Sequence, residues 1–371
     1  MLPYWREKVA AASGIHQPGK EIREILEVVR ADVLRAVGGD ASDGEIIYTG
    51  SATEAVNLGI WGCLRAQRQF GNHAVASAIE HPAILNSLEA FRGEGGCFDL
   101  IEVDTLGRIK LDRLDEVLTE ETLLLALQLA SPELGTIQDL SVVASMARDR
   151  SVVFFADATS AVGRLPIDVA SLKPDIMSFS ASSFGGPRGV GLLYKRSRIS
   201  LAPLYYGGEQ EQGLRPGEEN VPLIVGTGIA ARKLVESGSE IQRLCREKQR
   251  RLLERIGHRI AGVHLVGPEP GLTRLCHQLS LTIEGVEAEG LVLFADMRGL
   301  AMATAGGCLS RSLDTHYVLA AVGLSPLEAK QTISLGVSAE TTDDEIDEAV
   351  EILAMGVERL RSMSPSWSAK G

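Results

Sequence analysis

The chain has 371 residues, of which 45% are hydrophobic and 23% are charged, a composition typical of globular proteins. Its formal net charge is −12 and its basic residues are scattered, which argues against a nucleic-acid-binding protein. The longest apolar runs, at residues 123–130 and 152–156, fall short of the ~20 residues that a membrane helix needs. Because the N-terminus also lacks the apolar core of a signal peptide, we expect a cytoplasmic protein that binds neither nucleic acid nor membrane.

Short apolar strands alternate with helical stretches through the first two thirds of the chain. We expect helices at residues 21–37, 51–69 and 82–91, and strands at residues 45–48, 73–76, 123–130, 152–155 and 175–179. This alternation predicts a mostly parallel sheet covered by helices.

A long helical region follows at residues 221–256, broken near residues 237–239 by the sequence Ser-Gly-Ser. Beyond it we expect strands at residues 278–282 and 332–335, and helices at residues 289–296, 317–321 and 343–360. The sequence therefore predicts a large α/β domain at residues 11–225 and a smaller α+β domain at residues 226–371, joined by residues 1–10.

The cysteines are widely spaced and form no CxxC pair, so neither a disulfide framework nor a zinc site is indicated. The five positions are Cys63, Cys97, Cys245, Cys276 and Cys308. The first four lie in helical or strand-like contexts, and we expect them to be packing residues. Cys308 lies in a Gly- and Ser-rich segment at residues 303–312, which we expect to be exposed.

Four segments carry residues suited to chemistry. Residues 48–57 (YTGSATEAVN) place small and hydroxyl residues ahead of a helix, whose free backbone N–H groups bind anions such as phosphate. A simple N-cap by Ser51 or Thr53 is the alternative interpretation. His81 follows Glu80 at a strand-to-helix junction, where a single histidine is more often structural than catalytic.

The third segment, residues 155–168 (FADATSAVGRLPID), places Asp157 at the carboxyl end of a buried strand, where open α/β sheets bind ligands. A buried carboxylate needs a charged or hydrogen-bonded partner, and a protonated pyridine nitrogen would be one. The fourth segment, residues 178–191 (SFSASSFGGPRGVG), is a strand followed by a Gly-rich loop.

In this order and spacing, the four segments resemble the NifS-type cysteine desulfurases of the class V aminotransferase group. The resemblance continues through residues 207–220, 284–289, 308–319 and 334–336, and so covers nearly the whole chain. It implies a homodimer of the pyridoxal-phosphate aminotransferase fold, with a mostly parallel seven-stranded sheet in the large domain. Such enzymes take sulfur from L-cysteine as a persulfide on an enzyme cysteine and pass it to iron–sulfur or tRNA-thiolation partners.

The resemblance assigns roles to several matching positions. Ala52 and Thr53 fall on the family's phosphate-binding pair, and Ser180 falls on a phosphate-contacting serine. His81 falls on the histidine that stacks on the cofactor ring, and Asp157 on the carboxylate that pairs with the pyridinium. In the segment at residues 303–312, Cys308 falls on the sulfur-accepting cysteine.

Other positions depart from the family pattern. Ser182 and Ser183 stand where the family has His-Lys, and Ser183 removes the amine that forms the Schiff base, because a hydroxyl gives no imine. Residues that touch the ring, the partner subunit's phosphate and the substrate carboxylate are also replaced, at Pro132, Ser160, Glu218 and Val337. Each lost charged hydrogen bond costs about 1.5–3 kcal/mol of binding, so we expect pyridoxal phosphate to be absent or bound non-covalently.

Three functions are compatible with this pattern. The first is a catalytically silent dimer that binds an iron–sulfur scaffold protein or accepts sulfur through Cys308, which can be a metal ligand only for a cluster shared with a partner. The second is an active desulfurase, converting L-cysteine to L-alanine and an enzyme persulfide with non-covalently bound pyridoxal phosphate. The third is a heterodimer in which this chain supports an active paralogue.

If no cofactor is bound, we expect a small polar pocket where the family holds the cofactor ring, filled by water or a small anion. We expect Asp157 to hydrogen-bond there to His81 or to one of the surrounding hydroxyl groups. These hydroxyls belong to Ser160, Ser180, Ser182 and Ser183.

Overall fold

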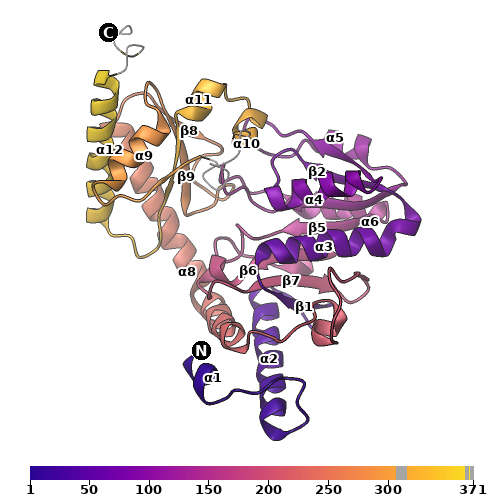
Figure 1. Ribbon diagram of the computed structural model, residues 1–371. Helices are drawn as coiled ribbons and strands as arrows, with labels where there is room; N and C mark the ends of the chain where they lie inside the picture. Colours follow the sequence, from indigo (N-terminus) through magenta and orange to yellow (C-terminus); the bar gives the residue numbers. More distant parts are fainter. Residues whose placement is uncertain (306–315, 364–366, 368–371) are drawn as a thin grey trace. The chain divides into compact units, whose positions relative to one another are not determined.

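The computed structural model describes residues 1–305, 316–363 and 367 (Figure 1). The chain divides into two compact units. The first comprises residues 1–101, 110–129 and 139–238, and the second comprises residues 102–109, 130–138 and 239–371. Every helix in the described parts of the chain is too short or too polar to cross a membrane.

The first unit is built on a seven-stranded sheet. Its order is β1 (Gly44–Thr49), β7 (Gly191–Arg196), β6 (Ile176–Ser180), β5 (Val153–Asp157), β4 (Thr122–Gln128), β2 (His73–Ser77) and β3 (Cys97–Ile101). Strands β2 to β6 pair in parallel, whereas β7 is antiparallel to both β6 and β1. Together with the smaller sheet of the second unit, this confirms the predicted aminotransferase-like α/β fold.

Helices cover this sheet. They are α2 (Gln17–Ala36), α3 (Ala52–Gln67), α4 (Pro82–Gly93), α5 (Leu111–Val117), α6 (Leu140–Asp149) and α7 (Val169–Leu172), whereas the short helix α1 (Leu2–Arg6) buries none of its residues. Helix α3 packs closely on β5, since a Cβ at Gly59 would lie 2.5 Å from the ring of Phe155. Helices α3 and α4 lie side by side and are joined by the edge-to-face pair of Trp61 and Phe91 (Figure 1). Three short 3₁₀ segments complete the unit: η1 (Arg68–Phe70), η2 (Ala181–Phe184) and η3 (Gln210–Gly213).

The second unit has an antiparallel sheet of four strands in the order β10 (Ala303–Thr304), β11 (Thr332–Gly336), β9 (Gln278–Ile283) and β8 (Val263–Val266). Its further helices are α9 (Ala288–Asp296), α10 (Tyr317–Ala321), α11 (Pro326–Lys330) and α12 (Asp343–Met363). Leu281, Ile333 and Leu353 form the centre of a core that joins the sheet to α12.

Helix α8 is continuous from Val221 to Arg259, so the predicted break near residues 237–239 was wrong. A single glycine such as Gly238 costs a helix only about 1 kcal/mol relative to alanine. Buried residues such as Ala231 and Cys245 anchor the helix on the two sides of Gly238, and this packing outweighs that cost.

Candidate functional site

The parallel strands β4, β5 and β6 end at Gln128, Asp157 and Ser180, on one edge of the sheet. Strand β1 runs in the same direction as β6, because both are antiparallel to β7. Gly191 of β7 pairs with Thr49 on one side and with Ser180 on the other, so the turn into α3 reaches the same edge.

This edge gathers the segments that carry the predicted site residues of the first unit. They are Ala52, Thr53, His81, Asp157, Ser160, Ser180, Ser182 and Ser183. Strand β2 also ends here, and the chain turns through residues 78–81 into α4. These segments therefore lie at the carboxyl edge of the sheet, where ligands bind in open α/β folds.

Asp157 is buried, with 6% of its surface exposed, but its partners differ from those we expected. Its Oδ1 accepts hydrogen bonds from the backbone N–H and the hydroxyl of Thr159, at 2.9 and 2.5 Å, and from the hydroxyl of Ser178 at 3.0 Å. Thr159 closes an Asx-turn two residues on, and Ser178 lies opposite Asp157 in the register of β5 and β6. Local geometry therefore supplies the partners that were expected from His81 and the serines of the loop.

The serines after β6 bond to one another. The hydroxyls of Ser180 and Ser182 lie 2.9 Å apart, and the hydroxyl of Ser183 donates to the carbonyl of Ser180 at 2.6 Å. The short helix η2 that carries them ends at Gly185, whose φ of 86° suits glycine. At the position of the expected lysine amine, the chain thus has a hydroxyl that is bonded to its own backbone.

The lysines that flank this segment lie at the other end of β6. Lys173 precedes the strand, and Lys195 pairs with Ile176 at its first residue. A strand of this length spans about 16 Å, well beyond the reach of a lysine side chain. The ammonium of Lys195 is also occupied, since it lies 2.9 Å from Glu45 Oε1 and 3.1 Å from the carbonyl of Ile199.

Two side chains at this edge cap helix starts, His81 among the predicted site residues and Ser51 as the alternative N-cap interpretation expected. His81 is the N-cap of α4, and its Nδ1 accepts a hydrogen bond from the N–H of Ala83 at 3.0 Å. Ser51 caps α3 by accepting from the N–H of Glu54 at 3.1 Å. Thr53 therefore lies in the first turn of α3, where backbone N–H groups lack helical partners and favour an anion.

Glu80 belongs to this site, although the sequence did not single it out. Its side chain is fully buried, and the hydroxyl of Ser77 donates to Oε1 at 2.5 Å. Burial raises the pKa of the Glu80 carboxyl to about 8, and the nearby charge of Asp157 acts in the same direction. Gln128, which holds the carbonyl of Ile79 at 2.6 Å, was the available signal, because it interrupts an otherwise apolar strand.

Glu218 lines a cavity of about 200 Å³ next to the turn between β1 and α3. Glu219 lines it as well, and burial raises the pKa of that carboxyl. Arg215 is the guanidinium in the lining, but its Nε is bonded to Glu54 Oε1 at 3.0 Å. Carboxylates in such a cavity repel a phosphate dianion.

Other predicted positions lie in the second unit. Val337 follows β11 and is half-buried against the core of that unit, so it acts as an apolar packing residue. Pro132 lies in the segment of residues 130–138. Cys308 lies outside the described residues.

The site residues fit pyridoxal phosphate only in part. Asp157 keeps a buried carboxylate at the strand end, and the first turn of α3 keeps its N–H groups. The segment of residues 174–194 contains no lysine, so the covalent anchor that the resemblance implies does not fit this chain. Ser183 cannot form an imine with the aldehyde of the cofactor, and the carboxylate of Glu218 repels its phosphate.

Comparisons with known proteins identify the family to which the chain belongs. A family model described as aminotransferase class-V matches residues 1–348. Cysteine desulfurase IscS 1 of Archaeoglobus fulgidus is 35% identical over 99% of this chain and 94% of that protein. Cysteine desulfurase IscS of Photorhabdus laumondii is 36% identical over 96% of this chain and 87% of that protein.

Solved structures give the same result. A NifS-like protein superposes with a TM-score of 0.89 at 27% identity, covering 96% of this chain and 94% of that one. DndA from Streptomyces lividans superposes with a TM-score of 0.77 at 27% identity, covering 91% and 94%. The chain therefore belongs to the class-V aminotransferase family, and its homologues include cysteine desulfurases of the IscS and NifS type.

Proposed function

We propose that this chain is a sulfur-transfer or iron–sulfur assembly protein of the desulfurase type that has lost pyridoxal-phosphate catalysis. The proposal rests on the loop after β6. In this loop the Ser183 hydroxyl is hydrogen-bonded to the carbonyl of Ser180, and no lysine occurs from residue 174 to 194. An imine requires an amine, so this loop holds no cofactor covalently.

Two further features support the loss of catalysis. Glu218 adds a carboxylate to the cavity beside α3, at the position where the resemblance implies a residue that contacts the partner subunit's phosphate. Val337 packs against an apolar core at the position where family members clamp the substrate carboxylate with arginine. Cofactor anchor, phosphate contact and substrate clamp serve one reaction, and all three have changed.

The remaining activity that we propose is protein binding and sulfur acceptance by a cytoplasmic homodimer through Cys308. The named relatives are cysteine desulfurases, which supports a place in sulfur transfer. Incubation with an active desulfurase and L-cysteine should add one sulfur atom to the mass of the peptide that contains Cys308. A Cys308→Ser chain should gain none, and sulfur appearing only on other cysteines would contradict this role.

An active desulfurase with non-covalent pyridoxal phosphate is the second candidate. Asp157 favours it, because a buried carboxylate at the carboxyl end of β5 is suited to a protonated pyridine nitrogen. However, Asp157 Oδ1 already accepts hydrogen bonds from Thr159 and Ser178, so this oxygen is stabilised without a pyridine nitrogen.

Absorbance spectroscopy separates the two candidates. The purified chain is incubated with excess pyridoxal phosphate, passed through a desalting column and scanned in the visible range. We expect no retained band, and no change on adding borohydride or L-cysteine. A retained yellow colour that responds to L-cysteine would contradict the loss of catalysis.

A further inference from the structure

Two cysteines that were expected to be packing residues lie together in the second unit. Cys245 is on α8, and Cys276 is in the turn that leads into β9. Both are buried, with 4% and 3% of their surfaces exposed, and the Cys245 thiol is hydrogen-bonded to Cys276. The prediction of a strand-like or helical context was therefore wrong for Cys276.

The turn is fixed to α8 one helical turn beyond Cys245. Gln249 Nε2 donates to the carbonyls of Leu275 and Gln278, each at 2.7 Å, and these two residues bracket Cys276. Because residues i and i+4 share a helix face, Cys245 faces the same turn as Gln249. The Gln249 side chain therefore holds the turn that carries Cys276 against the helix that carries Cys245, without a contact to sulfur.

Val337 connects the two cysteine segments a second time. Its N–H donates to the carbonyl of His277 at 2.9 Å, and its carbonyl accepts from the Cys245 thiol at 3.4 Å. The helix, the turn and the end of β11 therefore meet at the thiol pair.

The surroundings favour a thiolate at Cys276. Hydrogen bonding with Cys245 lowers the pKa of the Cys276 thiol to about 5, and His277 and Arg246 act in the same direction against the effect of burial. Cys63 is the contrast within the chain, because burial raises the pKa of its thiol to about 12. Since the thiolate is the nucleophile, Cys276 is the reactive member of these buried cysteines.

Within residues 1–305, 316–363 and 367, His, Cys, Asp and Glu side chains form no group of three suited to a metal ion. A paired thiol and thiolate without further ligands is instead suited to two-electron oxidation. The low exposure of both residues restricts the oxidant to a small, uncharged molecule.

We propose that Cys276 and Cys245 form a reversible dithiol–disulfide couple, in which a small hydroperoxide oxidises Cys276 and Cys245 resolves the product. The Cys276 sulfur attacks one peroxide oxygen, the O–O bond breaks, and sulfur becomes a sulfenic acid while the other oxygen leaves as an alcohol or water after taking a proton. The Cys245 sulfur then attacks the sulfenic sulfur, the S–S bond forms, and hydroxide leaves with the Cys245 proton as water.

The couple loses two electrons and two protons overall, and a dithiol reductant restores both thiols by exchange. Oxidation links α8 covalently to the turn before β9. It also removes the thiol proton that the carbonyl of Val337 accepts, so Val337 keeps only its hydrogen bond to His277. This chemistry is independent of the role proposed for Cys308.

Peptide mass spectrometry of the reduced full-length chain tests the proposal. The chain is treated with limiting hydrogen peroxide, its remaining thiols are alkylated, and it is digested with trypsin. We expect a cross-linked product of peptides 244–246 and 275–298 that disappears after treatment with dithiothreitol. Both peptides recovered singly and alkylated, while peroxide has oxidised Cys97 or Cys308, would overturn the proposal.

Single variants assign the two roles. In Cys245→Ser, the sulfenic acid should persist on Cys276 and react with dimedone, whereas in Cys276→Ser the peroxide should leave Cys245 unoxidised. Cys63→Ser is the matched control and should form the cross-link as the wild type does. A Cys276 that resists dimedone in Cys245→Ser would overturn its assignment as the attacking thiol.

Discussion

At the scale of single residues, Glu80 makes the free energy of unfolding depend on pH, and one substitution can test this. Its carboxyl keeps a proton to about pH 8 in the folded chain, whereas the ordinary pKa of 4.5 applies after unfolding. Between these values the folded state binds the extra proton, so the free energy of unfolding falls as pH rises through this window. One such proton contributes a slope of at most about 1.4 kcal/mol per pH unit.

Glu80→Gln removes this titration and should flatten the fall in stability between about pH 5 and pH 8. The measurement is urea unfolding of wild type and variant across that range. Glu89→Gln, at an exposed site on α4, should keep the wild-type slope. Identical slopes for wild type and Glu80→Gln would show that Glu80 titrates normally.

Ser183→Lys should not restore cysteine desulfuration, because it returns only the amine. Glu218 would still line the phosphate-side cavity, and Val337 would still replace the substrate clamp. Sulfide release from L-cysteine in the presence of pyridoxal phosphate and a reductant measures the effect, with the wild type as the baseline. Full recovery in Ser183→Lys would mean that the other changes are neutral.

The residues of this site differ in how well the sequence predicts them. Asp157 and Ser183 could be placed because each follows an apolar strand within a recognisable segment. Glu80 was missed although Gln128 interrupts an apolar run, because the sequence does not show that Gln128 of β4 holds the carbonyl of Ile79, next to Glu80. A contact between a strand and a loop that is distant in sequence leaves no pattern within the loop itself.

At the scale of elements, Gly191 fixes the junction of β7 with the turn into α3. A Cβ there would lie 2.0 Å from the carbonyl oxygen of Ser51, so the backbone of one segment would have to move. We expect Gly191→Ala to lower the free energy of unfolding by about 2–3 kcal/mol, the scale of overpacking. Thermal and urea unfolding would measure it.

Gly93→Ala is the matched control for this prediction. Gly93 ends α4, and nothing lies within 4 Å of an added Cβ. Alanine there should be neutral or should stabilise the chain by about 0.5 kcal/mol. Equal effects of the two substitutions would argue against a close contact at Gly191.

Elements with a clear apolar pattern were predicted within a few residues, as for β5 and α4. Strand β3 was missed because it is an edge strand, exposed along most of its length. The break predicted in α8 failed for the opposite reason, since packing on both sides of Gly238 overrides a weak local preference. The number of strands was expected from the family resemblance, and their order was not predicted, because periodicity alone does not specify which strands pair.

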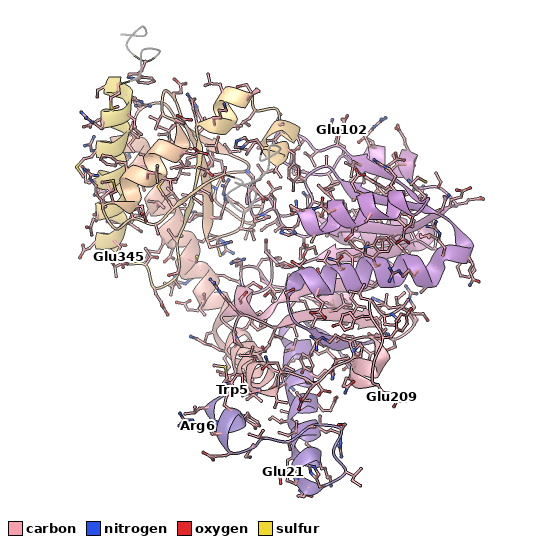
Figure 2. All side chains as sticks on the ribbon, in the orientation of Figure 1. Trp5, Arg6, Glu21, Glu102, Glu209 and Glu345 are labelled. Carbon is pink, nitrogen blue, oxygen red and sulfur yellow. The ribbon has the colours of Figure 1, made fainter. Side chains whose placement is uncertain are left out.

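At the scale of the whole molecule, exposed apolar residues near the N-terminus support the proposed homodimer. Ile15 is fully exposed, Val9 is 72% exposed, and Trp5 projects from α1 (Figure 2). Sedimentation should give twice the mass of one chain, and Val9→Glu with Ile15→Glu should shift it toward the monomer. Leu272→Glu, at an exposed apolar site of the second unit, should leave the mass unchanged.

The most direct test of the lost catalysis is L-alanine formation from L-cysteine by the purified chain. The assay contains excess pyridoxal phosphate and a reductant, and IscS 1 of Archaeoglobus fulgidus serves as a parallel sample. Because Ser183 supplies no amine, we expect this chain to form no more L-alanine than buffer with pyridoxal phosphate alone. Sustained turnover that exceeds this background and disappears in Cys308→Ser would contradict the account.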